Sequence, residues 1–129
     1  MLRVRHSPGD PCCISASAAE LKAIAGRLRV FAENSDSKLA FDCEQSGDAK
    51  PYSSFIKQLV FHKNKGKDRF SLFDMILLYQ AEKEGFLRLA SFFDFPDNAA
   101  FGHHAHHEYY PGNECISADS EPAVIVVEN

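Results

Sequence analysis

The chain contains an internal repeat, and this feature constrains the architecture most because repeats must be recognised before individual elements are assigned. Shifting the sequence by 65 residues without a gap superposes two hydrophobic patterns, although identical residues are few. The paired positions include Leu21 with Phe86, Ile24 with Leu89, Ala25 with Ala90, Leu28 with Phe93, Val60 with Ile125 and Phe61 with Val126. We therefore expect one domain, residues 1–129, built from copies at about 12–62 and 77–127.

The first copy is predicted to run strand, helix, strand, strand. Residues 18–31 carry apolar side chains at the spacing of one helix face, and Ser17 is the expected N-cap in a capping box with Glu20. Alternating or continuous apolar residues predict strands before and after this helix. These strands are expected at Cys12–Ser17, Lys38–Glu44 and Ser54–His62.

The second copy restates this order after a basic connection at residues 63–69. Pro96 ends its helix, and the apolar last strand is expected in the interior of a sheet. The elements are a strand at Arg69–Tyr79 with a candidate break near Asp74, a helix at Glu82–Phe95 and strands at Phe101–Tyr110 and Ala123–Val127. The pattern predicts an α+β fold of two pseudo-symmetric β-α-β-β units, with one mostly antiparallel sheet of about six strands and both helices on one face.

Composition indicates the cellular compartment in which the chain is expected. The longest apolar stretch, Met75–Tyr79, is too short to span a membrane, and the amino terminus lacks a secretory apolar segment. Cytoplasmic localisation is therefore expected. The four cysteines lack metal-type spacing, so we interpret them as reduced thiols that are buried as small hydrophobic side chains.

Charge is divided unevenly between the two halves. Residues 1–73 contain 12 Lys and Arg against 8 Asp and Glu, a net charge of +4, whereas residues 74–129 contain 2 against 10, a net charge of −8. An acidic half repels nucleic acid and anionic lipid and favours a basic partner, so neither a nucleic acid nor a membrane is expected as a partner. The basic connection could contact phosphate, but without interleaved aromatic residues a solvated turn is favoured.

A histidine-rich segment at residues 103–108 is the main candidate for chemistry. In an extended strand, His104, His106 and Glu108 share one face and could hold zinc, but no cofactor is expected. The repeat favours another interpretation, because it aligns His104 and His106 with Leu39 and Phe41 of the first copy. Those imidazoles would then be buried beneath the second helix as structural or partner-binding side chains.

Three groups of residues resemble a known family. They are Gly85, Phe86, Leu87, Leu89 and Ala90 on the helix, His104 and His106 on the strand, and Ser120, Glu121, Ala123, Val124 and Ile125 near the last strand. Within Leu77–Glu128 this pattern resembles the small α+β immunity proteins of bacterial polymorphic-toxin systems. The resemblance implies a protein without catalytic activity that binds and blocks a cognate toxin, often a nuclease. Four histidines stand here where the family pattern has one pair.

The acidic half offers a surface suited to such a partner. Tyrosines give large contact areas at low ordering cost, and acidic side chains around them attract a basic protein. The predicted partner-binding residues are Glu108, Tyr109, Tyr110, Glu114, Asp119 and Glu121. Two alternatives remain open, namely a metal-dependent enzyme that uses His104, His106 and Glu108, and a homodimer that covers the exposed aromatic residues at its twofold interface.

Overall fold

The computed structural model describes residues 1–128, so Asn129, the last residue of the expected domain, lies outside the described residues. Eleven elements follow one another within these 128 residues. They are β1 (Arg3–His6), β2 (Cys12–Ala16), α1 (Ala18–Glu33), β3 (Lys38–Asp42), β4 (Ser54–Phe55), β5 (Gln58–Lys63), β6 (Arg69–Phe73), β7 (Ile76–Ala81), α2 (Lys83–Phe93), β8 (His104–His107) and β9 (Ala123–Val127).

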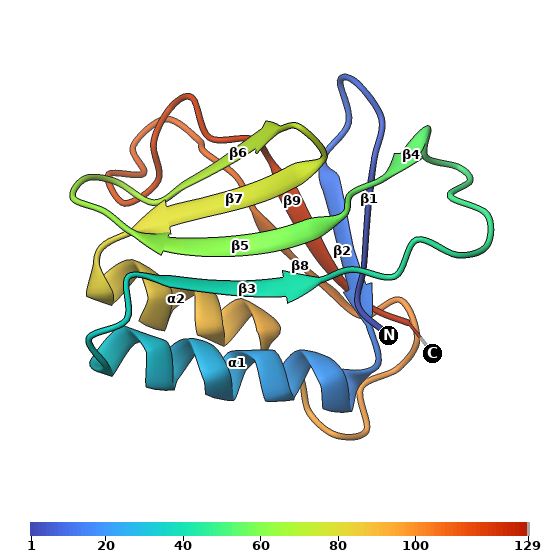
Figure 1. The fold of residues 1–129 in the computed structure, drawn as a ribbon, viewed down its shortest axis with the longest axis horizontal. Helices are drawn as coiled ribbons and strands as arrows, with labels where there is room; N and C mark the ends of the chain where they lie inside the picture. Colours follow the sequence, from blue (N-terminus) through green and yellow to red (C-terminus); the bar gives the residue numbers. More distant parts are fainter. Residues whose placement is uncertain (129) are drawn as a thin grey trace.

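The strands form two mixed sheets beside a pair of helices. One sheet has the order β4-β1-β2-β9-β8 and the other has the order β3-β5-β7-β6. In Figure 1 the four-stranded sheet faces the viewer, and both helices lie below it, running in opposite directions. The expected α+β class is confirmed, but the sheet of about six strands is replaced by sheets of five and four.

Each sheet combines strands from both halves of the chain. The antiparallel pair β1–β2 joins the antiparallel pair β8–β9 through a parallel ladder between β2 and β9. The other sheet joins β3–β5 to β6–β7 through a parallel ladder between β5 and β7. The two halves are therefore interlocked rather than placed side by side.

Three local features explain the extra strands. Residues 3–6, which the sequence analysis left unassigned, form β1. The strand expected at Arg69–Tyr79 folds back as a hairpin at Asp74 and Met75, whose positive φ angles of 48° and 61° fit a tight turn. The strand expected at Ser54–His62 changes sheet between two residues, because the Ile56 N–H bonds to Val4 while the Lys57 N–H bonds to Met75.

Both helices follow the sequence closely. The capping box predicted at Ser17 and Glu20 is present, and the predicted apolar faces of α1 and α2 are buried. The helices meet through Phe31 and Phe86, whose ring centroids are 5.1 Å apart and edge to face. Within residues 1–128, neither helix has both the length and the apolar character needed to cross a bilayer.

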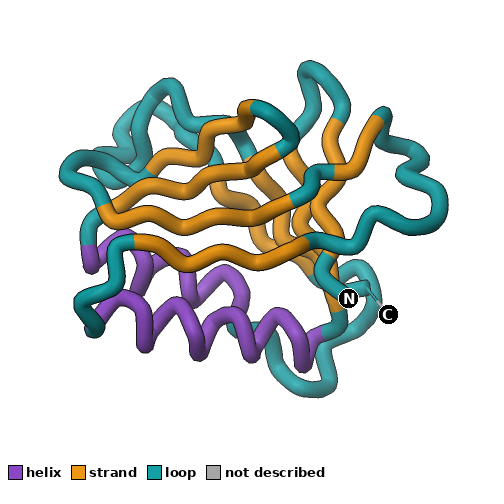
Figure 2. The backbone as a smooth tube through the Cα atoms, in the orientation of Figure 1, coloured by secondary structure: helices purple, strands orange, loops and turns teal. Residues whose placement is uncertain are grey.

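One hydrophobic core lies between the sheets and the helix pair. Its largest fully buried side chains include Tyr79, Phe61, Phe70 and Phe86, which come from three strands and one helix. The last strand, β9, lies between β2 and β8, so its predicted interior position is confirmed. Two long connections, residues 43–53 and 108–122, lie at opposite ends of the molecule in Figure 2.

Candidate functional site

The connection between β8 and β9, residues 108–122, contains all six residues predicted for partner binding, and it is fixed along β6. The Asp68 N–H donates to the Cys115 carbonyl at 2.9 Å, and the Ser117 N–H donates to the Asp68 carbonyl at 2.9 Å. Further along, the Glu121 N–H donates to the Phe70 carbonyl at 2.8 Å. The connection thus continues hydrogen bonding beyond the outer strand of the four-stranded sheet.

A turn inside this connection is fixed by Asn113. Its side-chain Oδ1 accepts from the N–H groups of Cys115 at 2.9 Å and Ile116 at 3.3 Å, and its own N–H donates to the Tyr110 carbonyl at 3.0 Å. Gly112, with φ of +94°, supplies the left-handed backbone that this turn requires. Tyr110 is therefore attached to an ordered loop.

Beneath the connection lies an ion pair between the buried Asp68 and the exposed Arg88 that the sequence did not indicate. Asp68 is 2 % exposed. Its carboxylate oxygens accept hydrogen bonds from Arg88 Nε at 3.1 Å and Arg88 Nη2 at 2.9 Å. Gly85 makes room for it, since a Cβ there would press against Ala81 Cβ and Asp68 Oδ1. Because the same Asp68 backbone holds Cys115 and Ser117, the pair fixes the loop from below.

His107 lies beside this pair and is also 2 % exposed. Its ring packs edge to face against Phe70, Tyr79 and Phe92, with centroids 5.1, 5.6 and 5.6 Å away. Within residues 1–128 its Nδ1 atom has no hydrogen-bond partner. Burial lowers the pKa of His107 while the Asp68 carboxylate opposes that shift, so the neutral imidazole is favoured.

The predicted partner-binding residues fall into two groups. Glu108, Tyr109, Tyr110 and Glu114 are exposed around the Asn113 turn, and Tyr110 is 60 % exposed. Tyr110 also lines a hollow of about 240 Å³ whose other walls include Arg88, Phe92, His107, Cys115 and Ile116.

Asp119 and Glu121 lie further along, toward β6. Asp119 is paired with Arg69 at 3.3 Å, and the Ser117 hydroxyl, followed by Arg69, holds the pKa of its carboxyl below the usual range. Glu121 is half-buried. The structure therefore does not gather all six residues into one acidic patch.

The expected burial of His104 and His106 is wrong. Both residues are exposed, and the neighbours that face the core are Ala105 and His107. On β3 the residues that pack against the core are Leu39 and Phe41, so the matching positions on β8 lie 66 residues later rather than 65. A displacement of one residue moves each side chain of a strand to the opposite face, and the gapless superposition missed it.

The exposed imidazoles of His104 and His106 lie close together, with ring centroids 5.0 Å apart. The His104 Nδ1 atom is 3.0 Å from the Gly102 carbonyl oxygen. Among residues 1–128, no group of three or more His, Cys, Asp or Glu side chains is arranged to hold a metal ion, so Glu108 does not complete a site with the two histidines here.

The cysteines fit the expectation at three of four positions. Cys12, Cys13 and Cys43 are free and buried, and burial raises the pKa of Cys12 and of Cys43 to about 12. Cys115 is free but exposed, in the wall of the hollow beside Tyr110.

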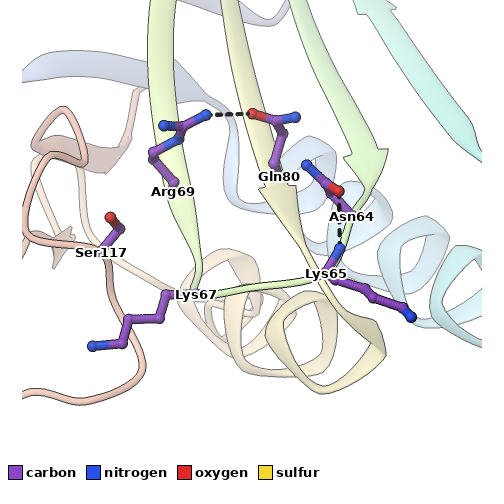
Figure 3. Close-up of a pocket in the computed structure, with 6 residues that line it drawn as sticks. All are labelled: Asn64, Lys65, Lys67, Arg69, Gln80 and Ser117. Atoms are coloured by element: carbon purple, nitrogen blue, oxygen red, sulfur yellow. Dashed lines mark hydrogen bonds between the residues drawn. The ribbon is translucent and has the colours of Figure 1, made fainter.

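A second, basic hollow of about 240 Å³ lies where the β5–β6 connection meets the β8–β9 connection. It is lined by Asn64, Lys65, Lys67, Arg69, Gln80 and Ser117. Figure 3 shows Lys65 and Lys67 extending in different directions, while Arg69 and Gln80 face each other across neighbouring strands. The basic connection is thus part of a hollow with one wall supplied by the four-stranded sheet.

Comparisons with known proteins identified no relative of this chain. The sequence matches no model of a known family, and comparisons with characterised proteins and with solved structures gave no significant match.

Two glycine substitutions should have opposite effects on stability, because Gly85 lies against Asp68 and Gly26 has open space around it. Gly85→Ala should lower the free energy of unfolding by about 1–3 kcal/mol, because the added methyl group displaces the Asp68 carboxylate. Gly26→Ala, in a helical position with nothing near its Cβ, should raise it by roughly 0.5–1 kcal/mol. Urea unfolding of both variants measures this difference, and equal effects would contradict the close approach at Gly85.

The buried imidazole predicts a dependence of stability on pH. Because the native pKa of His107 is lowered, protonation favours the unfolded chain, and stability should fall as the pH drops below about 6.5. His107→Phe should remove this part of the loss, whereas the exposed control His106→Phe should retain it. Urea midpoints measured between about pH 7 and 5.5 check this. The same slope in both variants would show that His107 does not contribute.

Proposed function

We propose that this chain is a non-catalytic binding protein that neutralises a basic protein partner, in the manner of a toxin-directed immunity protein. The main support is that Glu108, Tyr109, Tyr110 and Glu114 are exposed on a connection whose backbone is hydrogen bonded to β6. A nuclease is a suitable partner, since an enzyme that binds a phosphate chain presents a basic surface.

The hollow beside Tyr110 supports a role as the centre of this surface. It is large enough for one side chain of a partner, and Phe92, Ile116 and Tyr110 supply apolar walls. Buried aromatic contacts at the centre of an interface contribute most of the binding energy. Exposed Glu108 and Glu114 beside it would act mainly on the association rate by attracting a basic partner.

The ordered backbone of the connection also favours binding. A loop that must become ordered when it binds loses affinity to conformational entropy. Here the Asn113 turn, the bonds to Asp68 and the bond to Phe70 fix the loop in the free protein. Asp119 and Glu121 would lie at the edge of the interface, since Asp119 is already paired with Arg69. Free cysteines are compatible with action in the cytoplasm.

The fold itself supports a related proposal about its origin. We infer that the halves are copies of one unit related by a pseudo-twofold axis. Each half contributes one hairpin before its helix and one antiparallel strand pair after it, and the hairpins are exchanged between sheets. Equivalent connections bond in the same way, because the Ile56 N–H donates to Val4 and the Glu121 N–H donates to Phe70, both at 2.8 Å.

Expression with the proteins encoded beside this gene tests the binding function. One neighbour should be toxic when expressed alone and harmless when this chain is present, and the purified pair should bind. Tyr109→Ala with Tyr110→Ala should weaken binding by about 2 kcal/mol or more, roughly 30-fold, whereas the exposed control Phe101→Ala should not. Calorimetry measures both affinities.

Charge reversal provides the second arm of this experiment. Glu108→Lys with Glu114→Lys should slow association about 10-fold at low salt, and the control pair Asp10→Lys with Asp97→Lys, at exposed positions elsewhere, should not. If no neighbouring product binds, or if the loop variants bind as tightly as the unchanged protein, the proposed function is wrong.

A further inference from the structure

The outer face of the four-stranded sheet carries side chains in three rows that cross all four strands. The strand registers and the inward direction of Leu39, Phe61 and Tyr79 determine these rows. From one end of the sheet to the other they are Asp42, Gln58, Ile76 and Phe73; then Ala40, Val60, Leu78 and Ser71; then Lys38, His62, Gln80 and Arg69. The third row is basic through Lys38 and Arg69 and the second is mostly apolar, whereas the first places Asp42 and Gln58 beside Ile76 and Phe73.

The apolar part of this face is hollowed. A depression of about 530 Å³ is lined by side chains of β3, β5, β6 and β7, including Val60, Ile76 and Leu78. Phe73, at its end, is 48 % exposed. No helix crosses in front of this sheet in Figure 1, and Lys38, His62 and Phe73 in the lining of the depression are exposed.

The basic row continues into the hollow of Figure 3. Gln80 lines both depressions, and Lys65, Lys67 and Arg69 line the second. Within residues 1–128, Lys38, Lys65 and Lys67 make no ion pair, and all three are exposed. Among the acidic groups nearby, Asp119 is paired with Arg69, whereas Glu82 accepts from the Gly66 N–H at 3.4 Å and Asp42 accepts from Gln58 at 3.0 Å.

We propose that this face binds single-stranded nucleic acid, with phosphates along the basic row and bases over the apolar rows. A basic track beside an apolar or aromatic platform is the arrangement that holds unpaired strands without sequence preference. Four strands at ordinary spacing make the basic row roughly 14 Å long, enough for a few nucleotides. A duplex would not expose its base faces to Ile76, Leu78 and Phe73.

The proposal differs from the expectation, based on the charge of the second half, that no nucleic acid is a partner. The chain has a net charge of −4, but a ligand responds to the local field, and the basic groups gather on one end of this sheet. The proposal does not depend on the partner-binding surface around Tyr110, so either one can fail without the other.

Fluorescence anisotropy with a labelled oligouridine of about 12 nucleotides tests the proposal. The unchanged protein should bind, and its affinity should fall steeply between about 50 and 200 mM salt. Lys38→Glu with Lys67→Glu should weaken binding about 10-fold or more at low salt. The matched control Lys22→Glu with Lys50→Glu makes the same change in net charge at exposed positions outside both hollows and should have little effect.

A neutral variant separates base contact from charge. Phe73→Ala should weaken binding a few-fold and leave the salt dependence unchanged. Thermal melts of the Lys38/Lys67 and Phe73 variants should match the unchanged protein, because these side chains are exposed and make no ion pair within residues 1–128. The control variant loses the Lys22 contacts with Asp94 and Asp97, so its folded fraction is measured before its binding is compared.

Four results would overturn the proposal. They are no binding at low salt, equal losses in the Lys38/Lys67 and control variants, duplex DNA of equal length binding as tightly, or polyglutamate competing as well as unlabelled oligouridine. The last result would assign the face to acidic protein segments instead.

Discussion

Two parallel ladders, between β2 and β9 and between β5 and β7, hold the whole structure together. The first ladder joins strands from the two ends of the chain, the second joins the strands that precede and follow β6 in sequence, and each lies inside its sheet with an antiparallel strand on either side. Ile14 faces Ile125 across one ladder and Phe61 faces Tyr79 across the other, all of them fully buried. Neither half could complete a sheet alone, and the ends of β8 and β6, where the candidate surfaces lie, depend on both ladders.

The sequence predicts those features that arise from local pattern. The apolar spacing of α1 and α2, the capping box at Ser17 and the interior position of β9 are all encoded within a few neighbouring residues. The number of strands is not encoded in this way. Asp74 and Met75 adopt positive φ without a glycine to indicate a turn, and the passage from one sheet to the other at Ile56 depends on distant strands.

The candidate site could be predicted from the sequence only in part. The exposed Glu108, Tyr109, Tyr110 and Glu114 could be chosen from charge and residue type. The inward face of β8 could not be predicted, because a shift of one residue in the alignment of the two copies decides whether His106 or His107 points inward. Nor could the pairing of Asp68 with Arg88, which are 20 residues apart and meet only because Gly85 leaves room between β6 and α2.

The two proposed surfaces have opposite local charge and meet at a single pair. Arg69 belongs to the basic row of the four-stranded sheet, and its partner Asp119 belongs to the β8–β9 connection. Binding at one surface would therefore act close to the other, although the two probes that test them are independent.

Native-state hydrogen exchange tests most directly the claim that the parallel ladders interlock the halves. Amides that bond across β2–β9 and across β5–β7 should exchange with one common free energy, equal to that of global unfolding measured with urea, since opening either ladder exposes the shared core. If the strands of one sheet exchanged through a much smaller free energy while those of the other remained protected, the halves would not be interlocked in this way.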